Sequence, residues 1–328
     1  MPRNPAKLSH CYVPLPVPQR EDASSKVTKP IRSDGRSSTH ELRRLCLETS
    51  VISKAMGSAL VELGHTKVLA EIQITAAKAS RPGTASRQQS NNEATTERGS
   101  LKCNISYAPH IGMNQVVQQS SSVSPLDGTT SNNNNNSNNQ NSAAPTVSSG
   151  KLHQELAVRE ANLSRKLTEA LLPVVVLEQY PKCTLVINIT ILQDDGSCLS
   201  AAITAASMAL VDARVELKDM VTSCTVAVIE NPNKKDYDEM DDDEEDDDED
   251  YFLYLADPTQ DEVRSKAAVI CLAMTPNHKE VTLWSQSGKL SSNMASEAMK
   301  LCRDGCRTMH KFMRESWIST CSKEMANQ

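Results

Sequence analysis

Residues 191–214 read ILQDDGSCLSAAITAASMALVDAR, and they join the end of a predicted strand to a predicted helix. The apolar run stops at the polar residues Asp194–Ser197, and a helix built almost wholly of small residues follows. A strand, a tight turn and a helix start bring free backbone N–H groups and the positive end of a helix dipole together, which favours phosphate binding. The turn is therefore either a phosphate site or the remnant of one.

The sequence around this turn alternates between groups of strand patterns and helix patterns. Alternating apolar residues predict strands, one of them a hairpin turning at Gly64-His65, at residues 45–53, 57–75, 99–109, 183–192, 221–229, 251–257, 266–274 and 280–286. Helical spacing of apolar residues predicts helices at residues 152–172, 199–213 and 291–318. Helices between groups of strands indicate an α/β (α+β) fold in which mixed sheets pack with helices.

Two insertions and one tail have compositions that bury little apolar surface. An Asn/Ser-rich tract occupies residues 114–150, and an acidic insertion occupies residues 231–250. Both compositions predict disordered insertions. The proline-containing residues 1–30 predict a disordered N-terminal tail. The folded domain is therefore expected over residues 31–322, interrupted by the two insertions.

The charge of the chain is concentrated in one place. The formal net charge is −6, from 35 Lys and Arg against 41 Asp and Glu. Thirteen of the acidic residues lie within residues 236–250, so the rest of the chain would carry +7. A basic body suits RNA or another acidic partner, although an ordinary surface with a solubilising loop accounts for the same charge. Two Phe, two Trp and six Tyr argue against a base-stacking platform, so RNA contacts would involve backbone phosphates.

Cysteine usage and hydropathy indicate an intracellular class of protein. The ten cysteines include no CxxC pair, and the closest two, Cys302 and Cys306, have helical spacing. This pattern is typical of reduced, buried cysteines in a cytosolic or nuclear protein, and it predicts no zinc site. The first residues carry no apolar signal segment, and no apolar run approaches the length of a membrane span. We therefore expect no membrane association.

Three motifs, in the same order along the chain, resemble the RNase PH family. They are RSDGR (32–36), GSALVELGHTKVLAEI (57–72) and the opening stretch continued to Cys224. The resemblance implies an RNase PH-like fold, also described as ribosomal protein S5 domain 2-like. This family includes phosphorolytic 3′-to-5′ exoribonucleases and the ring subunits of the RNA exosome.

Three further stretches resemble one class of exosome ring subunit, the messenger-RNA transport regulator 3 type. They are ERGSLKCNISYAP (97–109), LADPTQDE (255–262) and EAMKLCRDGCRTMHKFMRES (297–316).

The resemblance implies that the phosphate ligands of active members are missing here. In those members a Thr and an Arg after the Asp-Gly turn hold phosphate, and the matching residues are Cys198 and Leu199. A thiol is a weak hydrogen-bond donor and a leucine side chain donates none. Ser197 also replaces a glycine that lets the backbone close around the anion.

The carboxylates that active members use are also incomplete. Asp257 matches the first of two aspartates six residues apart, whereas Val263 stands at the second. Asp261 and Glu262 are possible substitutes, but a one-residue shift on a strand-like segment reverses the side that a residue faces. Glu169 stands where active members commonly have an arginine, and it would repel RNA phosphate.

Two arginines are candidates for RNA contacts. Arg159 matches a family arginine that contacts the RNA backbone, although an ordinary helix-surface arginine would look the same. Arg98, before the strand at residues 99–109, is a weaker candidate. The HELRR cluster, His40 to Arg44, is expected to be a solvated face.

These residues lead to one functional hypothesis and two alternatives. The resemblance implies a non-catalytic ring subunit of the RNA exosome that supports assembly and RNA threading in rRNA processing and mRNA turnover. Its partners would be paralogous RNase PH-like ring subunits, S1/KH cap proteins and RNA, in the nucleus, nucleolus and cytoplasm, and it would need no metal or cofactor. The alternatives are an active phosphate-dependent 3′-to-5′ exoribonuclease and a free-standing module that binds RNA or histones through its acidic loop.

Overall fold

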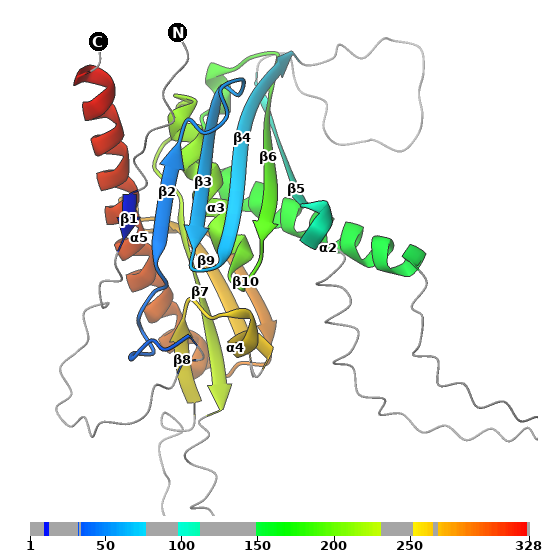
Figure 1. Cartoon of the computed structure of the whole chain (residues 1–328), viewed down its shortest axis with the longest axis vertical. Helices are drawn as coiled ribbons and strands as arrows, with labels where there is room; N and C mark the ends of the chain where they lie inside the picture. Colours follow the sequence, from blue (N-terminus) through cyan, green and yellow to red (C-terminus); the bar gives the residue numbers. More distant parts are fainter. Residues whose placement is uncertain are drawn as a thin grey trace, which may run out of the picture.

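Two sheets with a helix between them form the part of the chain that the computed structural model describes (Figure 1). That part comprises residues 10–12, 32, 34–76, 98–111, 149–230, 252–264 and 268–326. The six-stranded sheet has the order β1-β2-β3-β4-β6-β5, and the four-stranded sheet has the order β10-β9-β7-β8. Both predicted insertions lie mostly or wholly outside the described residues.

The six-stranded sheet contains the first half of the predicted strands. Its members are β1 (His10–Tyr12), β2 (Leu45–Thr49), β3 (Gly57–Leu63), β4 (Thr66–Ala76), β5 (Ser100–Tyr107) and β6 (Cys183–Gln193). Only the β5–β6 pair is parallel among these described strands. β1 lies within residues 1–30, the predicted tail, and it pairs with β2 at the edge of the sheet. β2 ends before the predicted limit of 53, because Ser50 adopts a left-handed conformation with φ +57°.

Helix α2 (Ser149–Leu171) runs beside β5, the last strand of the sheet. The Ser164 hydroxyl accepts a hydrogen bond from the Ile105 N–H at 2.8 Å, and the Glu160 carboxylate accepts one from the Tyr107 N–H at 2.8 Å. These side chains bond the outward N–H groups of an edge strand, which would otherwise be open to pairing with another chain. Because α2 is fixed in this way, Arg159 lies next to the end of β5.

Helix α3 (Cys198–Asp212) is the predicted helix of small residues, and it packs between the two sheets. All residues from Leu199 to Leu210 are buried. On one side β3 comes so close that a Cβ added to Gly57 would lie 2.4 Å from the Ala209 carbonyl oxygen. On the other side the Ser200 hydroxyl donates to the Ser223 carbonyl at 2.8 Å. Small side chains are therefore required on both faces of α3.

The four-stranded sheet and the last helix complete the fold. The sheet contains β7 (Thr222–Glu230), β8 (Phe252–Ala256), β9 (Ala268–Thr275) and β10 (Glu280–Gly288), and the chain ends with α5 (Ser292–Ala326). Helix α5 packs on β7, and a Cβ added to Gly305 would lie 2.5 Å from the Cys224 sulfur. The predicted end of this helix at residue 318 is wrong, because it continues for two more turns.

Two short helices were not predicted, η1 (Leu177–Gln179) and α4 (Gln260–Arg264). They are too short to show a helical period in the sequence. None of the described helices is long and apolar enough to cross a membrane. The cysteines whose side chains the structure describes are free thiols.

Candidate phosphate site

The turn between β6 and α3 is held by groups of the protein itself. Gly196 has φ +89° and Ser197 has φ +54°, and the Ser197 side chain makes no capping hydrogen bond to the start of α3. The Ser197 hydroxyl instead donates to the Pro258 carbonyl at 3.3 Å. The Thr66 hydroxyl accepts from the Asp195 N–H at 3.0 Å and donates to the Gly196 carbonyl at 2.8 Å. The turn is thus fastened to the β3–β4 hairpin and to the segment after β8.

The two residues at the predicted phosphate-binding positions, Cys198 and Leu199, contribute no positive charge. Leu199 is 8% exposed and belongs to the apolar core. Burial raises the pKa of the Cys198 thiol to about 12, so it stays neutral at physiological pH. The Cys198 sulfur lies 3.9 Å from the Tyr107 hydroxyl. The start of α3 therefore presents a core leucine and a neutral thiol where an anion would need a cation and a strong donor.

Arg159 lies beside this turn and is partly exposed. Its guanidinium lies 5.4 Å from the centroid of the Tyr107 ring and 3.5 Å from the buried Asp194 carboxylate. Asp194 also accepts a hydrogen bond from the Gly196 N–H at 3.1 Å. Because the Arg159 side chain is 30% exposed, part of its surface remains open to a ligand.

Arg98 does not join this site. It forms an ion pair with Glu178 at 3.1 Å, and both side chains are more than half exposed. It precedes the start of β5, whereas Arg159 contacts Tyr107 at the end of that strand. β5 has eight residues and spans about 23 Å, and the two arginines lie near its opposite ends. Glu169, the predicted repulsive residue, pairs with Arg165 on the exposed surface of α2.

Asp257 is engaged by a buried arginine. The Arg43 Nε and Nη2 atoms donate to the two carboxylate oxygens of Asp257 at 2.9 and 2.8 Å, and the Arg43 backbone N–H donates at 3.1 Å. Both side chains are only 4% exposed. Arg43 also donates to the carbonyls of Asp195 and Gly196 at 2.8 and 3.1 Å. The carboxylate that matches a catalytic aspartate thus fixes the turn through Arg43.

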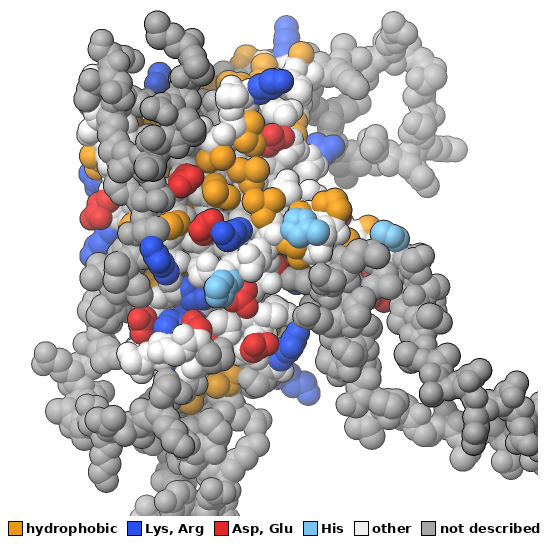
Figure 2. Space-filling model, viewed as in Figure 1, with side chains coloured by type: hydrophobic (Ala, Val, Ile, Leu, Met, Phe, Trp, Pro, Cys, Tyr) orange, Lys and Arg blue, Asp and Glu red, His pale blue; other side chains and the backbone are white. Residues whose placement is uncertain are grey.

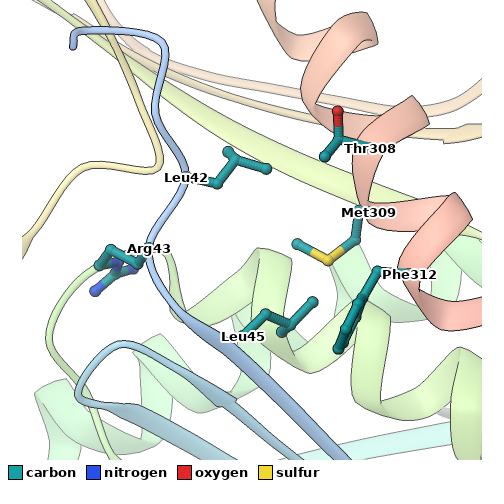
Figure 3. A pocket seen from close by; sticks show the side chains of 6 residues that line it. All are labelled: Leu42, Arg43, Leu45, Thr308, Met309 and Phe312. Carbon is teal, nitrogen blue, oxygen red and sulfur yellow. The ribbon is translucent and has the colours of Figure 1, made fainter. Parts of the chain in front are cut away.

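The prediction that His40 to Arg44 form a solvated face is wrong. Leu42 and Arg43 are buried on opposite sides of the chain. Figure 3 shows Leu42 and Leu45 directed toward Met309 and Phe312 of α5, whereas Arg43 points away from them. The gap between these apolar side chains is a cavity of only about 10 Å³. Arg43 can be buried with its charge because the fold places the Asp257 carboxylate next to it.

The segment after Asp257 is helical, so the assumption of a strand-like segment is wrong. Glu262 lies in α4 and accepts two hydrogen bonds from Arg32, at 3.0 and 2.9 Å. Asp261 is on the exposed side and pairs with Arg264. Val263 is half-buried in the same helix. Neither carboxylate therefore stands free as a second catalytic acid.

A third arginine joins this buried cluster. Arg36 is hydrogen-bonded to the Asp257 carbonyl at 2.9 Å and to Asp34 at 2.7 Å. The cluster was missed in the sequence because its members lie in three separate segments, at residues 32–36, 43 and 257–262. The signal that could have indicated it is the pair of arginines in RSDGR, which the family motif contains. Among the described residues, no group of three or more His, Cys, Asp or Glu side chains could hold a metal ion.

The arginines lower the pKa values of the buried carboxylates. Burial alone would raise the pKa of Asp257, but the charge and hydrogen bonds of Arg43 outweigh burial and lower it. Burial opposes the ionisation of Glu262 in the same way, and the hydrogen bonds from Arg32 lower its pKa. Both groups are therefore ionised in the folded chain at neutral pH.

We expect stability to fall in acid because of this cluster. Carboxylates with a depressed pKa stabilise the fold at pH values above their unfolded pKa, about 4, and this contribution is lost as the pH drops through the folded values. Thermal unfolding measured at about pH 7, 5 and 3 should show little change in melting temperature down to about pH 5 and a fall below it. A variant that lacks the Asp257 carboxylate should show a shallower fall, and an identical pH profile would contradict the assignment.

Known proteins match the chain in sequence over most of its length. Residues 41–216 match the model of the 3′ exoribonuclease family, domain 1 (RNase PH). The chain is 28% identical to the human exosome complex component MTR3, over 87% of this chain and 86% of that protein. It is 25% identical to the exosome complex component RRP41-like of Arabidopsis thaliana, over 90% of this chain and 86% of that protein.

Solved structures share the fold. The crystal structure of rice (Oryza sativa) Rrp46 matches with a TM-score of 0.55 and 17% identity, over 87% of this chain and 99% of that chain. An Archaeoglobus fulgidus exosome structure with RNA bound to the active site matches with a TM-score of 0.55 and 19% identity, over 85% of this chain and 91% of that chain.

Proposed function

The chain belongs to the 3′ exoribonuclease (RNase PH) family, and we propose that it is a non-catalytic ring subunit of the RNA exosome. The relatives named exosome complex component support a role as an exosome component. Within that role the subunit would support ring assembly and the passage of RNA toward a separate nuclease, in rRNA processing and mRNA turnover.

The non-catalytic part of this proposal rests on one observation: Leu199 and Asp257, the two key positions of the site, are both buried. Leu199 lies in the core where active members place a phosphate-binding arginine. Asp257 is fully engaged by Arg43, and Val263 offers no second carboxylate. Phosphate ligands and catalytic carboxylates each contribute orders of magnitude to a rate. Their joint loss supports a subunit kept for assembly.

The outer face of the six-stranded sheet supports an assembly role. Helix α3 covers one face of this sheet, and the side chains on the other face are half-exposed. Leu60 of β3 and Leu69 of β4 are paired on this outer face. Figure 2 shows hydrophobic side chains gathered over the middle of the sheet, with acidic and basic side chains around them. Such a face fits contact with paralogous ring subunits. We extend the proposal to S1/KH cap proteins as further partners, and to the nucleus, nucleolus and cytoplasm as locations.

We expect the purified chain to release no nucleoside diphosphates from single-stranded RNA when inorganic phosphate is added. The assay follows shortening of a 5′-labelled RNA with and without phosphate, and an active relative of the same family serves as the positive control. Phosphate-dependent shortening by the pure chain would contradict the proposal. Affinity purification of the native chain should recover paralogous RNase PH-like subunits.

A phosphate-dependent exoribonuclease is the second candidate function. It is favoured by Arg159, which remains partly exposed beside the turn, and by the similarity to proteins named Rrp41. The RNA-shortening assay separates the two candidates directly.

A further inference from the structure

Helix α5 carries a row of exposed cations, which we call the basic stripe. Its members are Lys300, Arg303, Arg307, Lys311 and Arg314. At about 100° per residue, these positions lie within an arc of about 80° and extend over about 21 Å of the helix. The opposite side of α5 is its buried face, which contains Cys302, Cys306, Met309 and Met313. A polar outer face is ordinary for such a helix, but five cations against three neighbouring acids, Glu297, Asp304 and Glu315, give this one an excess of positive charge.

Nearby acids leave the basic stripe with a net positive charge. Lys300 pairs with Glu297, and Arg307 pairs with Asp304 at 2.7 Å, one turn apart in each case. These pairs are about half exposed, so they are weak and screened by salt. Arg303, Lys311 and Arg314 form no ion pair with any residue that the structure describes. Their charges remain available to an anionic partner.

The chemistry of the basic stripe indicates a nucleic acid as the partner. Protein–protein interfaces have cores that are depleted of charged residues and enriched in aromatic and apolar side chains. From Lys300 to Arg314 the exposed residues are all basic, and the first exposed apolar side chain after them is Ile318. Interfaces with nucleic acids, in contrast, are strongly positive, and phosphate contacts supply sequence-independent affinity. A straight row of cations also matches a linear polyanion better than a compact acidic patch.

We propose that the basic stripe of α5 binds the phosphate backbone of single-stranded RNA, independently of sequence. The choice of RNA as the polyanion rests on the proposed function. The positive charge of the basic stripe and its linear arrangement are observed independently of that function. The stripe is separate from the β6–α3 turn, since α5 packs on β7 and β9 and the turn is fastened to β3–β4 and to residue 258. RNA bound there would contact the outside of α5 rather than the degenerate site.

The test measures RNA affinity of the full-length chain after charge reversal on the stripe. The variant combines Arg303→Glu, Lys311→Glu and Arg314→Glu, the three cations without ion pairs among the described residues. Fluorescence anisotropy with a labelled single-stranded RNA should show affinity weaker by roughly tenfold or more at about 0.1 M salt. The slope of log affinity against log salt should fall by about 2, since each single-strand phosphate contact contributes about 0.7.

A matched control reverses three exposed cations elsewhere, Lys54→Glu, Lys102→Glu and Lys289→Glu. It changes the net charge equally, and it should lose much less affinity and keep its salt slope. Equal losses in both variants would overturn the proposal. Circular dichroism should show the same folded signal for both variants. A third variant with Arg303→Lys and Arg314→Lys should retain binding, because the contact needs only positive charge.

Two further readouts distinguish RNA binding at the stripe from protein docking. If stripe reversal abolished binding of a poly-glutamate peptide but left RNA binding intact, the stripe would be a protein-docking site and the proposal would be wrong. Co-purification of paralogous ring subunits with the stripe variant should be unchanged. Failure of the wild-type chain to co-purify with them would contradict the proposed function alone, because RNA affinity is measured on the isolated chain.

Discussion

Replacing Asp257 with alanine is expected to lower the free energy of unfolding by about 3–5 kcal/mol. The substitution leaves the Arg43 guanidinium buried without the carboxylate that accepts two of its hydrogen bonds. It also removes the acceptor of the Arg43 backbone N–H. Arg43 would keep only its longer ion pair with the partly exposed Asp195, at 3.7 Å. A buried charge that loses its main partner costs much more than the intact pair contributes, so the effect should be large. Urea unfolding followed by circular dichroism measures it.

The control for this prediction is Asp261→Ala in the same segment. The Asp261 side chain is 75% exposed, so its loss should change the free energy of unfolding by less than about 0.5 kcal/mol. A double-mutant cycle with Arg43→Ala should give a coupling energy above about 1 kcal/mol between Arg43 and Asp257. Equal stabilities of the Asp257 and Asp261 variants would show that the Arg43–Asp257 pair does not hold the fold.

This measurement also distinguishes two roles for Asp257. A catalytic carboxylate can be removed with loss of activity and little loss of stability, and active sites often gain stability when they are neutralised. A carboxylate that positions Arg43 shows the reverse, a large loss of stability. Because Asp257 accepts two hydrogen bonds from the Arg43 guanidinium, we expect its replacement to change the stability of the fold rather than a catalytic activity.

Gly196→Ala should have the second largest effect, a loss of roughly 3 kcal/mol in the free energy of unfolding. Gly196 has φ +89°, a conformation that costs an L-residue roughly 1–2 kcal/mol. An alanine Cβ would also lie 2.6 Å from the Pro258 carbonyl oxygen and 2.8 Å from the Thr259 carbonyl carbon. Both neighbours are backbone atoms, so the turn and the segment after β8 would have to move apart. Thermal unfolding of the purified variant measures the loss.

The chain provides a matched control in Gly35→Ala. Gly35 has φ +83°, close to that of Gly196, but a Cβ added there would meet no atom within 4 Å. Its substitution should cost only the conformational strain, about 1 kcal/mol. The difference between the two variants then isolates the close approach of the turn to Pro258. If both variants lost the same stability, the close packing at Gly196 would contribute nothing.

Local patterns predicted the elements of the fold well. The strand at residues 183–192 and the helix at residues 199–213 match β6 and α3 within a few residues, because alternation and small-residue periodicity are local properties. The ends were less predictable. β2 ends early at the left-handed Ser50, and α5 continues past residue 318.

The electrostatics of the site could not be predicted from local sequence. Arg43 looked like part of a solvated cluster, because its partner Asp257 is 214 residues away in the sequence. Glu262 looked like an available acid, because Arg32 is 230 residues away. The burial of a charge depends on a partner that only the fold supplies. The absence of a cation at Cys198 and Leu199, in contrast, could be read directly from the sequence.

The position of α3 has a consequence for how the molecule unfolds. The helix contacts β3 and β4 on one side and β7 and β9 on the other, so each sheet loses the apolar cover of one face if the helix leaves. If either sheet separated from α3 by itself, it would expose the alanine and serine side chains of α3 that pack closely against the backbone of that sheet. The two sheets should therefore melt in a single cooperative transition, and backbone amides in α3 should exchange with solvent only through global unfolding. The family match ends at residue 216, but we expect the smallest unit that unfolds cooperatively to extend through β9.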